Sequence, residues 1–165
     1  MPTARCATML HPFTPDHFDY IIRWVDSPEL MERYSGPDFE WPWTREVLQE
    51  YIDTVHDRDR FMYSHEDTML GYGEVLYNGE FQPRLGRILI GPQAHRGKGH
   101  GAQMIRELVA YAKRHNPRER VYLYVYTDNA PAIRSYEGVG FHYTHDHPLP
   151  VPNMPHKQVH LMHLD

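Results

Sequence analysis

The sequence predicts a single α/β domain that spans residues 1–165. Apolar residues make up 41% of the chain and aromatic residues 13%, which is enough for one hydrophobic core without disulfides. Helical and strand periodicities alternate along the chain, as they do in domains that pack helices on a sheet. A glycine-rich segment also stands between an apolar strand pattern and a helical one.

The first half is expected to hold a strand, three helices and a hairpin. Thr14 is a favourable N-cap and Pro15 suits the first position of a helix, and Ser27 with Pro28 repeats this start signal. The residues 35–43 that follow the second helix read as an aromatic loop. The expected ranges are 5–10 for the strand, 14–25, 27–34 and 44–56 for the helices, and 60–64 with 69–77 for the hairpin.

The second half is expected to alternate strands and helices and then close with two strands. The run 85–90 is apolar enough for a buried strand, and the apolar side chains of 102–112 fall on one helical face. Four prolines between Pro148 and Pro155 predict a loop. The remaining ranges are 121–126 for a strand, up to 138 for a short helix, and 141–144 and 158–164 for the closing strands.

The segment Arg96-Gly-Lys-Gly-His-Gly101 is the most informative feature of the sequence. Three glycines leave backbone N–H groups uncovered, and a helix begins directly after them. Free N–H groups and the positive end of a helix dipole together bind anions, phosphates above all. The segment therefore predicts a site for a phosphate-bearing ligand.

Three kinds of phosphate-binding loop compete for this segment. A nucleotide P-loop fits poorly, because Gly91 lies one residue too far from Lys98 and Gly99 replaces the magnesium-binding hydroxyl. A dinucleotide fingerprint is formally present as Gly97, Gly99 and Ala102, but it lacks the tight turn and the acidic residue of that motif. The third is the pattern R/Q-x-x-G-x-G/A, which starts at Arg96.

A second segment decides between these interpretations. It reads N-x-x-A-x-x-x-Y-x-x-x-G-F from Asn129 to Phe141 and follows the expected strand 121–126. With both segments in this order, the chain resembles the GCN5-related N-acetyltransferase (GNAT) superfamily from about Arg84 to Phe141. The resemblance implies a mostly antiparallel central sheet with one splayed parallel strand pair and helices on both faces.

The resemblance also implies an activity. It predicts an acetyl-CoA-dependent N-acetyltransferase that transfers the acetyl group directly to a primary amine of a small-molecule or peptide acceptor. Two alternatives remain open: a non-catalytic CoA-binding regulatory module, and a dinucleotide-binding oxidoreductase that uses the glycine fingerprint.

Acetyl transfer requires a held thioester, a polarised carbonyl, a deprotonated amine and a protonated thiolate. In the family pattern Tyr136 is the acid that protonates the thiolate, and Glu74, in a strand beside small residues, is the candidate base. Tyr136 as a core aromatic and Glu74 as an exposed strand carboxylate are the alternatives. The expected cofactor-binding residues are Ile88, Leu89, Ile90, Arg96, Gly97, Lys98, Gly99, His100, Gly101 and Asn129.

The acceptor side is expected in residues 26–59, which carry ten carboxylates against three arginines. Asp38, Glu40 and Trp41 lie in an aromatic part of this region and are the candidate substrate-binding residues. An acidic and aromatic wall favours a cationic amine. A solvated helix face with aromatic anchors is the alternative.

Composition and charge limit the classes of partner that we expect this chain to bind. The net charge of −5 argues against nucleic acid, and no segment is long and apolar enough to cross a membrane. Cys6 is the only cysteine, which favours a reducing, cytoplasmic location and makes a covalent acetyl-enzyme route improbable. No metal is expected despite the histidines near the C-terminus, since proline-rich sequence separates them, and a homodimer remains open.

Overall fold

The computed structural model describes residues 8–92, 95–114 and 117–165. Within these ranges eight strands form one sheet with the order β1-β2-β3-β4-β5-β8-β6, and β7 pairs with β8. The strands are β1 Thr8–Pro12, β2 Arg58–His65, β3 Thr68–Leu76, β4 Arg84–Ile90, β5 Val121–Tyr126, β6 His142–Tyr143, β7 Leu149–Val151 and β8 Met154–Leu164.

The helices begin where the sequence places good caps. Ser27 Oγ accepts a hydrogen bond from the Leu30 N–H (3.1 Å), and Thr44 Oγ1 accepts one from the Val47 N–H (3.2 Å). The helices are α1 Phe18–Trp24, α2 Pro28–Ser35, α3 Arg45–Thr54, α4 His100–Ala112 and α5 Ala130–Val139, with short 3₁₀ helices η1 Pro15–His17 and η2 Gly36–Asp38.

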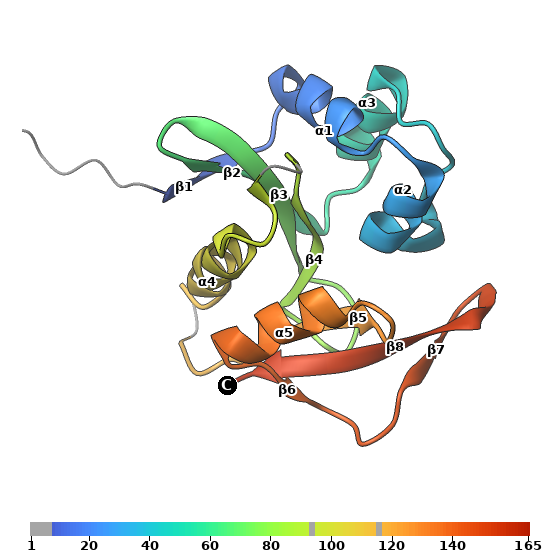
Figure 1. Cartoon of the computed structure of the whole chain (residues 1–165), viewed down its shortest axis with the longest axis vertical. Helices are drawn as coiled ribbons and strands as arrows, with labels where there is room; N and C mark the ends of the chain where they lie inside the picture. Colours follow the sequence, from blue (N-terminus) through green and yellow to red (C-terminus); the bar gives the residue numbers. More distant parts are fainter. Residues whose placement is uncertain (1–7, 93–94, 115–116) are drawn as a thin grey trace, which may run out of the picture.

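Helices cover both faces of the sheet, as expected (Figure 1). One core contains apolar side chains of α4 and α5, such as Leu108 and Tyr136, packed with the sheet residue Val125. The other core joins α1, α2 and α3 to the opposite face, with Trp24 and Leu89 among its members. Each layer therefore buries its own apolar surface against the shared sheet.

The sheet opens between β4 and β5, its one parallel pair. These strands pair only at Arg84–Tyr122 and Leu85–Leu123, and beyond this point they diverge (Figure 1). All the other strand pairs are antiparallel. This confirms the expected splayed pair, and it leaves the second half of β4 without a sheet neighbour on its β5 side.

The structure corrects the expectation of a loop at 148–155. Both β7 and the start of β8 lie there, with the pairs Leu149–Val159 and Pro150–Gln158. Proline lacks an N–H group, so it is tolerated where a strand lies at the edge of a sheet. Asn153 supplies the turn between the two strands with a φ of +63°. Cys6 and the start of the first expected strand lie outside the described residues.

Candidate active site

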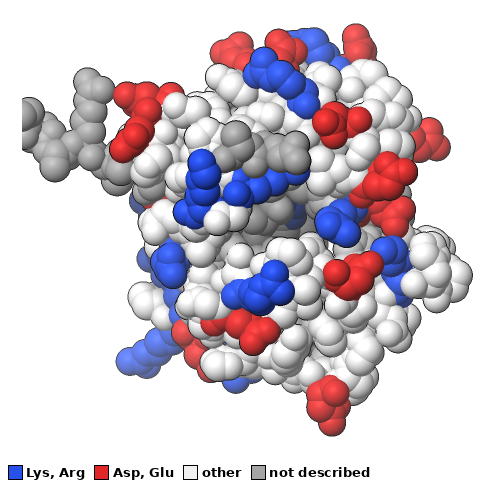
Figure 2. Space-filling model, viewed as in Figure 1, with Lys and Arg blue, Asp and Glu red and all other residues white. Residues whose placement is uncertain are grey.

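Two adjoining cavities open between the diverging strands. The loop cavity, of about 320 Å³, lies against the glycine loop and the start of α4. The sheet cavity, of about 590 Å³, lies between α2, β4 and β5 and extends to β7. Tyr136, Asn129 and Ile88 line both cavities, so the two meet at these residues. Figure 2 shows the hollow across this face, with cationic side chains on both of its rims.

The glycine loop presents bare backbone to the loop cavity. Gly97 and Gly99 have φ values of +76° and +85°, which residues with a side chain rarely adopt. A Cβ at either position would have no neighbour within 4 Å, so the space above the loop is open. Gly99 caps α4, which directs the first N–H groups of this helix toward the same space.

Arg96 holds the loop against the end of β4. Its guanidinium donates to the carbonyl oxygens of Ile90 (3.0 Å) and Gly91 (2.9 Å). The side chain is therefore engaged in the protein's own structure rather than being a free solvated cation.

Two of the expected cofactor residues direct their side chains elsewhere. Lys98 and His100 do not line the loop cavity, in contrast to Gly97, Gly99 and Gly101. The His100 ring lies 4.9 Å from that of His65, between centroids, and burial lowers its pKa. Lys98 and His100 can thus serve a ligand in the loop cavity through their backbone only.

The end of β4 offers backbone donors to the junction of the cavities. The Gly91 N–H donates to the Leu70 carbonyl oxygen on β3 (2.8 Å). Since alternate residues of a regular strand direct their N–H groups to opposite sides, the Ile90 N–H points away from β3, toward the gap between β4 and β5. Ile88 lies two residues earlier, where the register with β3 is irregular, and it lines both cavities. Leu89 lines the loop cavity as well.

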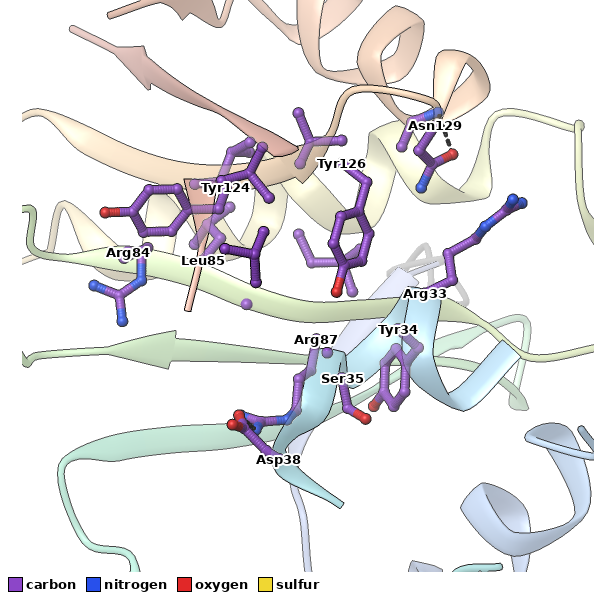
Figure 3. Close-up of a pocket in the computed structure, with 18 of the residues that line it drawn as sticks. Arg33, Tyr34, Ser35, Asp38, Arg84, Leu85, Arg87, Tyr124, Tyr126 and Asn129 are labelled. Carbon is purple, nitrogen blue, oxygen red and sulfur yellow. Dashed lines mark hydrogen bonds and ion pairs between the residues drawn. The ribbon is translucent and has the colours of Figure 1, made fainter. Parts of the chain in front are cut away.

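Tyr136 and Asn129 lie on α5 at the junction. Asn129 is the N-cap of α5, and its Oδ1 accepts a hydrogen bond from the Ala132 N–H (3.4 Å; Figure 3). Tyr136 is 8% exposed and packs edge-on against Phe141. Burial raises the pKa of its phenol to about 12. Its hydroxyl has no hydrogen-bond partner among the described residues.

Glu74 lies in a different place from the one expected of a base. It is fully buried, with 0% exposure, and lines neither cavity. Its Oε2 accepts hydrogen bonds from the hydroxyls of Tyr51 (2.6 Å) and Tyr72, and its Oε1 accepts from Arg87 (3.0 Å). The exposed-carboxylate alternative is therefore wrong. The base role has no geometric support either, since neither carboxylate oxygen faces the space where an amine could lie.

The three residues expected to bind the acceptor lie in different parts of the structure. Asp38 lines the sheet cavity, where it pairs with Arg87 (2.6 Å; Figure 3). Glu40 lines a third cavity of about 420 Å³ on the far side of this ion pair. Trp41 is 39% exposed and lines none of the three cavities.

Sequence reasoning missed most of the sheet-cavity lining. Arg87 is an arginine within the run 85–90, whose other residues are apolar or glycine, and this is a readable signal of a buried ion pair. The alternation of valine, leucine and tyrosine in β5 gives a second signal, since its tyrosines share the face away from α5. The missed lining residues include Arg33, Tyr34, Ser35, Arg84, Tyr124 and Tyr126 (Figure 3), together with Leu149 to Pro152.

Among the described residues, no group of three or more His, Cys, Asp or Glu side chains could hold a metal ion. None of their helices has the length and apolar character needed to span a membrane.

A splayed sheet with a glycine loop beside the gap is the architecture of an acyl-CoA-dependent acyltransferase. The family model described as "Acetyltransferase (GNAT) domain" matches residues 8–142, so the chain belongs to the GNAT acetyltransferase family. The acetyltransferases of this family use acetyl-CoA as co-substrate.

Curated relatives match over part of their length. An N-acetyltransferase of Bacillus subtilis, YobR, is 40% identical over 83 residues, which are 48% of this chain and 31% of YobR. The mycothiol acetyltransferase of Corynebacterium glutamicum is 29% identical over 127 residues, 76% of this chain and 42% of the relative. The chain thus spans less than half the length of these proteins.

Solved structures share the fold over nearly the whole chain. The spermidine N-acetyltransferase of Vibrio cholerae in complex with CoA and spermine has a TM-score of 0.76 and 20% identity, over 96% of this chain and 95% of that one. The aminoglycoside acetyltransferase AAC(6')-Ib in complex with CoA has a TM-score of 0.73 and 18% identity, over 95% and 94%. At these identities the likeness establishes the fold alone.

Proposed function

We propose that the chain is an acetyl-CoA-dependent N-acetyltransferase that transfers the acetyl group directly to a primary amine. One observation carries the proposal: the loop cavity and the sheet cavity meet at Tyr136 in the gap between β4 and β5. One cavity suits the phosphates of CoA and the other suits an acceptor. The thioester lies where they join.

In this arrangement the glycine loop binds the CoA pyrophosphate through the N–H groups at the start of α4. The N–H groups of Ile88 and Ile90 lie where they can donate to the thioester carbonyl oxygen. This oxygen becomes negatively charged when the amine attacks, and fixed donors aimed at such a charge lower the barrier. Asn129 contributes by fixing the start of α5 beside the cofactor.

The chemistry is a single displacement through a tetrahedral intermediate. The amine nitrogen forms a bond to the carbonyl carbon, and the carbon–sulfur bond then breaks. Tyr136 donates its phenolic proton to the departing sulfur, which yields CoA and the acetylated amine. The nitrogen loses one proton, which returns through solvent to the phenolate. The reaction therefore balances without a covalent enzyme intermediate.

The amine itself must be neutral to attack. For a lysine-like amine with a pKa of about 10.4, deprotonation at pH 7 costs about 4.6 kcal/mol. Glu74 is enclosed by its own partners, so we propose that water in the sheet cavity accepts this proton. The expected consequence is an acetylation rate that increases with pH as the neutral amine becomes more abundant.

The preferred acceptor is proposed to be cationic. Asp38 lines the sheet cavity beside its partner Arg87, and Glu40 lines the neighbouring cavity beyond this pair, so both carboxylates add negative charge near the opening through which an amine would approach. Arg33, Arg84 and Arg87 also line the sheet cavity, which makes an amine that carries an anionic group the competing substrate class. An amine library with polyamines, aminoglycosides, amino acids and peptides separates these classes.

The experiment that tests the proposed function measures ligand binding and turnover together. CoA and acetyl-CoA, but not NAD(H), should raise the melting temperature, and acetyl-CoA with the library should release free thiol. A ligand at 100 times its Kd stabilises a fold by about 2.7 kcal/mol. Stabilisation by NAD(H) alone would support the oxidoreductase alternative, and CoA binding without thiol release would support a regulatory module.

The proposal also covers the cellular location and the oligomeric state of the protein. We place the protein in the cytoplasm because its single cysteine suits a reducing compartment. Light scattering of the purified chain will show whether it forms a homodimer.

A further inference from the structure

Strand β4 carries one extra residue directly before the proposed oxyanion donors. Tyr72 pairs with Leu89 and Glu74 pairs with Gly86, so two residues of β4 lie opposite the single residue Gly73. This is a β-bulge, a feature that redirects the backbone groups beside it. The two bulge residues are Arg87 and Ile88.

Arg87 has a strained backbone in this bulge. Its φ is +47°, in the left-handed region that non-glycine residues seldom occupy. Such a conformation persists only where surrounding contacts hold it, and it marks sites where geometry matters for function. The contacts of Arg87 should therefore explain why the bulge is maintained.

The Arg87 guanidinium is held from three sides. It donates to Glu74 Oε1 on β3 (3.0 Å), to the Tyr51 hydroxyl on α3 (3.3 Å) and to Asp38 Oδ2 on η2 (2.6 Å). The side chain is only 10% exposed and lies over the ring of Phe39. One guanidinium thus connects the bulge to two neighbouring elements and to the adjacent strand.

Glu74 is a firm anchor for this connection. It is fully buried and also accepts hydrogen bonds from Arg58 (3.3 Å) and from the hydroxyls of Tyr51 and Tyr72. The carboxylate therefore cannot shift without breaking several other contacts. This gives the buried carboxylate a role that does not require contact with the amine.

We propose that Arg87, anchored by Glu74 and Asp38, is a positioning residue that fixes the bulge so that the Ile88 N–H points at the thioester carbonyl. The inference rests on the proposed function. The guanidinium touches neither acetyl group nor amine. It holds the peptide between Arg87 and Ile88 in the orientation that polarises the carbonyl. Without these contacts the bulge can shift, and the Ile88 N–H is no longer held in one direction toward the oxygen.

A simpler explanation is that Arg87 only neutralises Glu74. Arg58 offers a matched control, because it also donates to Glu74 but makes no hydrogen bond to β4 within the described residues. If neutralisation were the whole role, replacement of either arginine should have the same effect on the bound thioester.

The test compares Arg87→Gln, Arg87→Lys and Arg58→Gln in the full chain. Gln keeps a side chain on the left-handed backbone, so this variant changes the contacts and not the residue's intrinsic strain. Infrared difference spectra of bound acetyl-CoA, labelled with ¹³C at the acetyl carbonyl, report polarisation of that bond. Acetyl-CoA affinity, kcat and melting temperature are measured on the same samples.

For Arg87→Gln we expect the carbonyl frequency to move toward that of free acetyl-CoA. We also expect kcat to fall about 10²–10³-fold, with acetyl-CoA affinity within a few-fold of the parent. Arg87→Lys should recover part of both effects, while Arg58→Gln should lower the melting temperature without moving the frequency. If Arg87→Gln does not fold, Asp38→Asn replaces it, since it weakens one anchor of the guanidinium and leaves the residue on the left-handed backbone unchanged, and the same outcomes then apply to it.

An unchanged carbonyl frequency in the folded Arg87 variant would overturn the inference, even if kcat falls. Equal shifts in the Arg58 and Arg87 variants would also overturn it, in favour of simple neutralisation. Failure of the proposed function looks different, because the parent protein would then bind no acetyl-CoA and release no thiol.

Discussion

Replacement of Tyr136 by phenylalanine tests the proposed acid most directly. The ring keeps its packing against Phe141, and the only loss is a hydroxyl at the junction of the two cavities. Positioned acid catalysis contributes about 10²–10⁴-fold. This corresponds to about 2.7–5.4 kcal/mol of transition-state stabilisation, and kcat should fall in this range.

The structure also predicts the effect on stability. The Tyr136 hydroxyl has no hydrogen-bond partner among the described residues, so its removal breaks no bond. Tyr136 lines both cavities, so loss of its hydroxyl should leave the unfolding free energy nearly unchanged. A slow variant with an undiminished melting temperature is therefore the expected outcome.

The raised pKa of Tyr136 does not exclude the acid role. Burial raises this pKa to about 12 because the low-dielectric site penalises the phenolate. The same environment penalises the departing thiolate, whose pKa rises from its ordinary value of about 8.5. The pKa values of the phenol and of the thiol therefore rise together. The free-energy cost of proton transfer from Tyr136 to the thiolate is smaller than the raised pKa of the phenol alone would indicate.

The assay is single-turnover acetyl transfer, since slow product release could mask the chemical step in steady state. Tyr111→Phe is the control. It removes a hydroxyl that donates to Asp59 (2.7 Å) and lines neither cavity, so it should lower the melting temperature slightly and leave the rate unchanged. A single-turnover rate of Tyr136→Phe close to that of the parent would refute the acid role. A rate loss accompanied by a lower melting temperature would favour the core-aromatic alternative.

Three further predictions concern the cofactor, the acceptor and pH. CoA at 100 times its Kd should stabilise the parent by about 2.7 kcal/mol in a thermal-shift assay, and Gly99→Val should abolish this stabilisation. Gly138→Ala, on an open helix surface, is the control and should retain it. Glu40→Lys should lower kcat/KM for the amine more than it lowers the affinity for acetyl-CoA, and added salt should lower kcat/KM of the parent enzyme. A best substrate that is neutral or anionic would contradict the proposal of a cationic acceptor. Because Tyr136 keeps its proton below a pKa of about 12, kcat/KM should rise from pH 7 toward the amine pKa of about 10.4, and a decline from about pH 8 would contradict the assignment.

Local sequence determined the cofactor side of the site. The glycines between Arg96 and Gly101 dictate a loop with bare N–H groups, and the start signal at Asn129 dictates the cap of α5. These features depend on residues within one or two helical turns of each other, so spacing alone makes them readable. The order of the other strands and helices followed from periodicity in the same way, but β7 did not, because its prolines predicted a loop.

The tertiary structure alone decided the acceptor side. The sequence identifies Glu74 only as a carboxylate in a strand. Its burial involves a hydrogen bond from the hydroxyl of Tyr51, which lies 23 residues earlier in the chain. The Arg87–Asp38 ion pair joins residues 49 apart, and it separates Glu40 from the sheet cavity. No local pattern encodes such contacts, because they arise only when packing brings distant elements together. Local propensity therefore fixed the loop that we propose binds CoA, and long-range packing fixed the lining of the cavity that we propose for the amine.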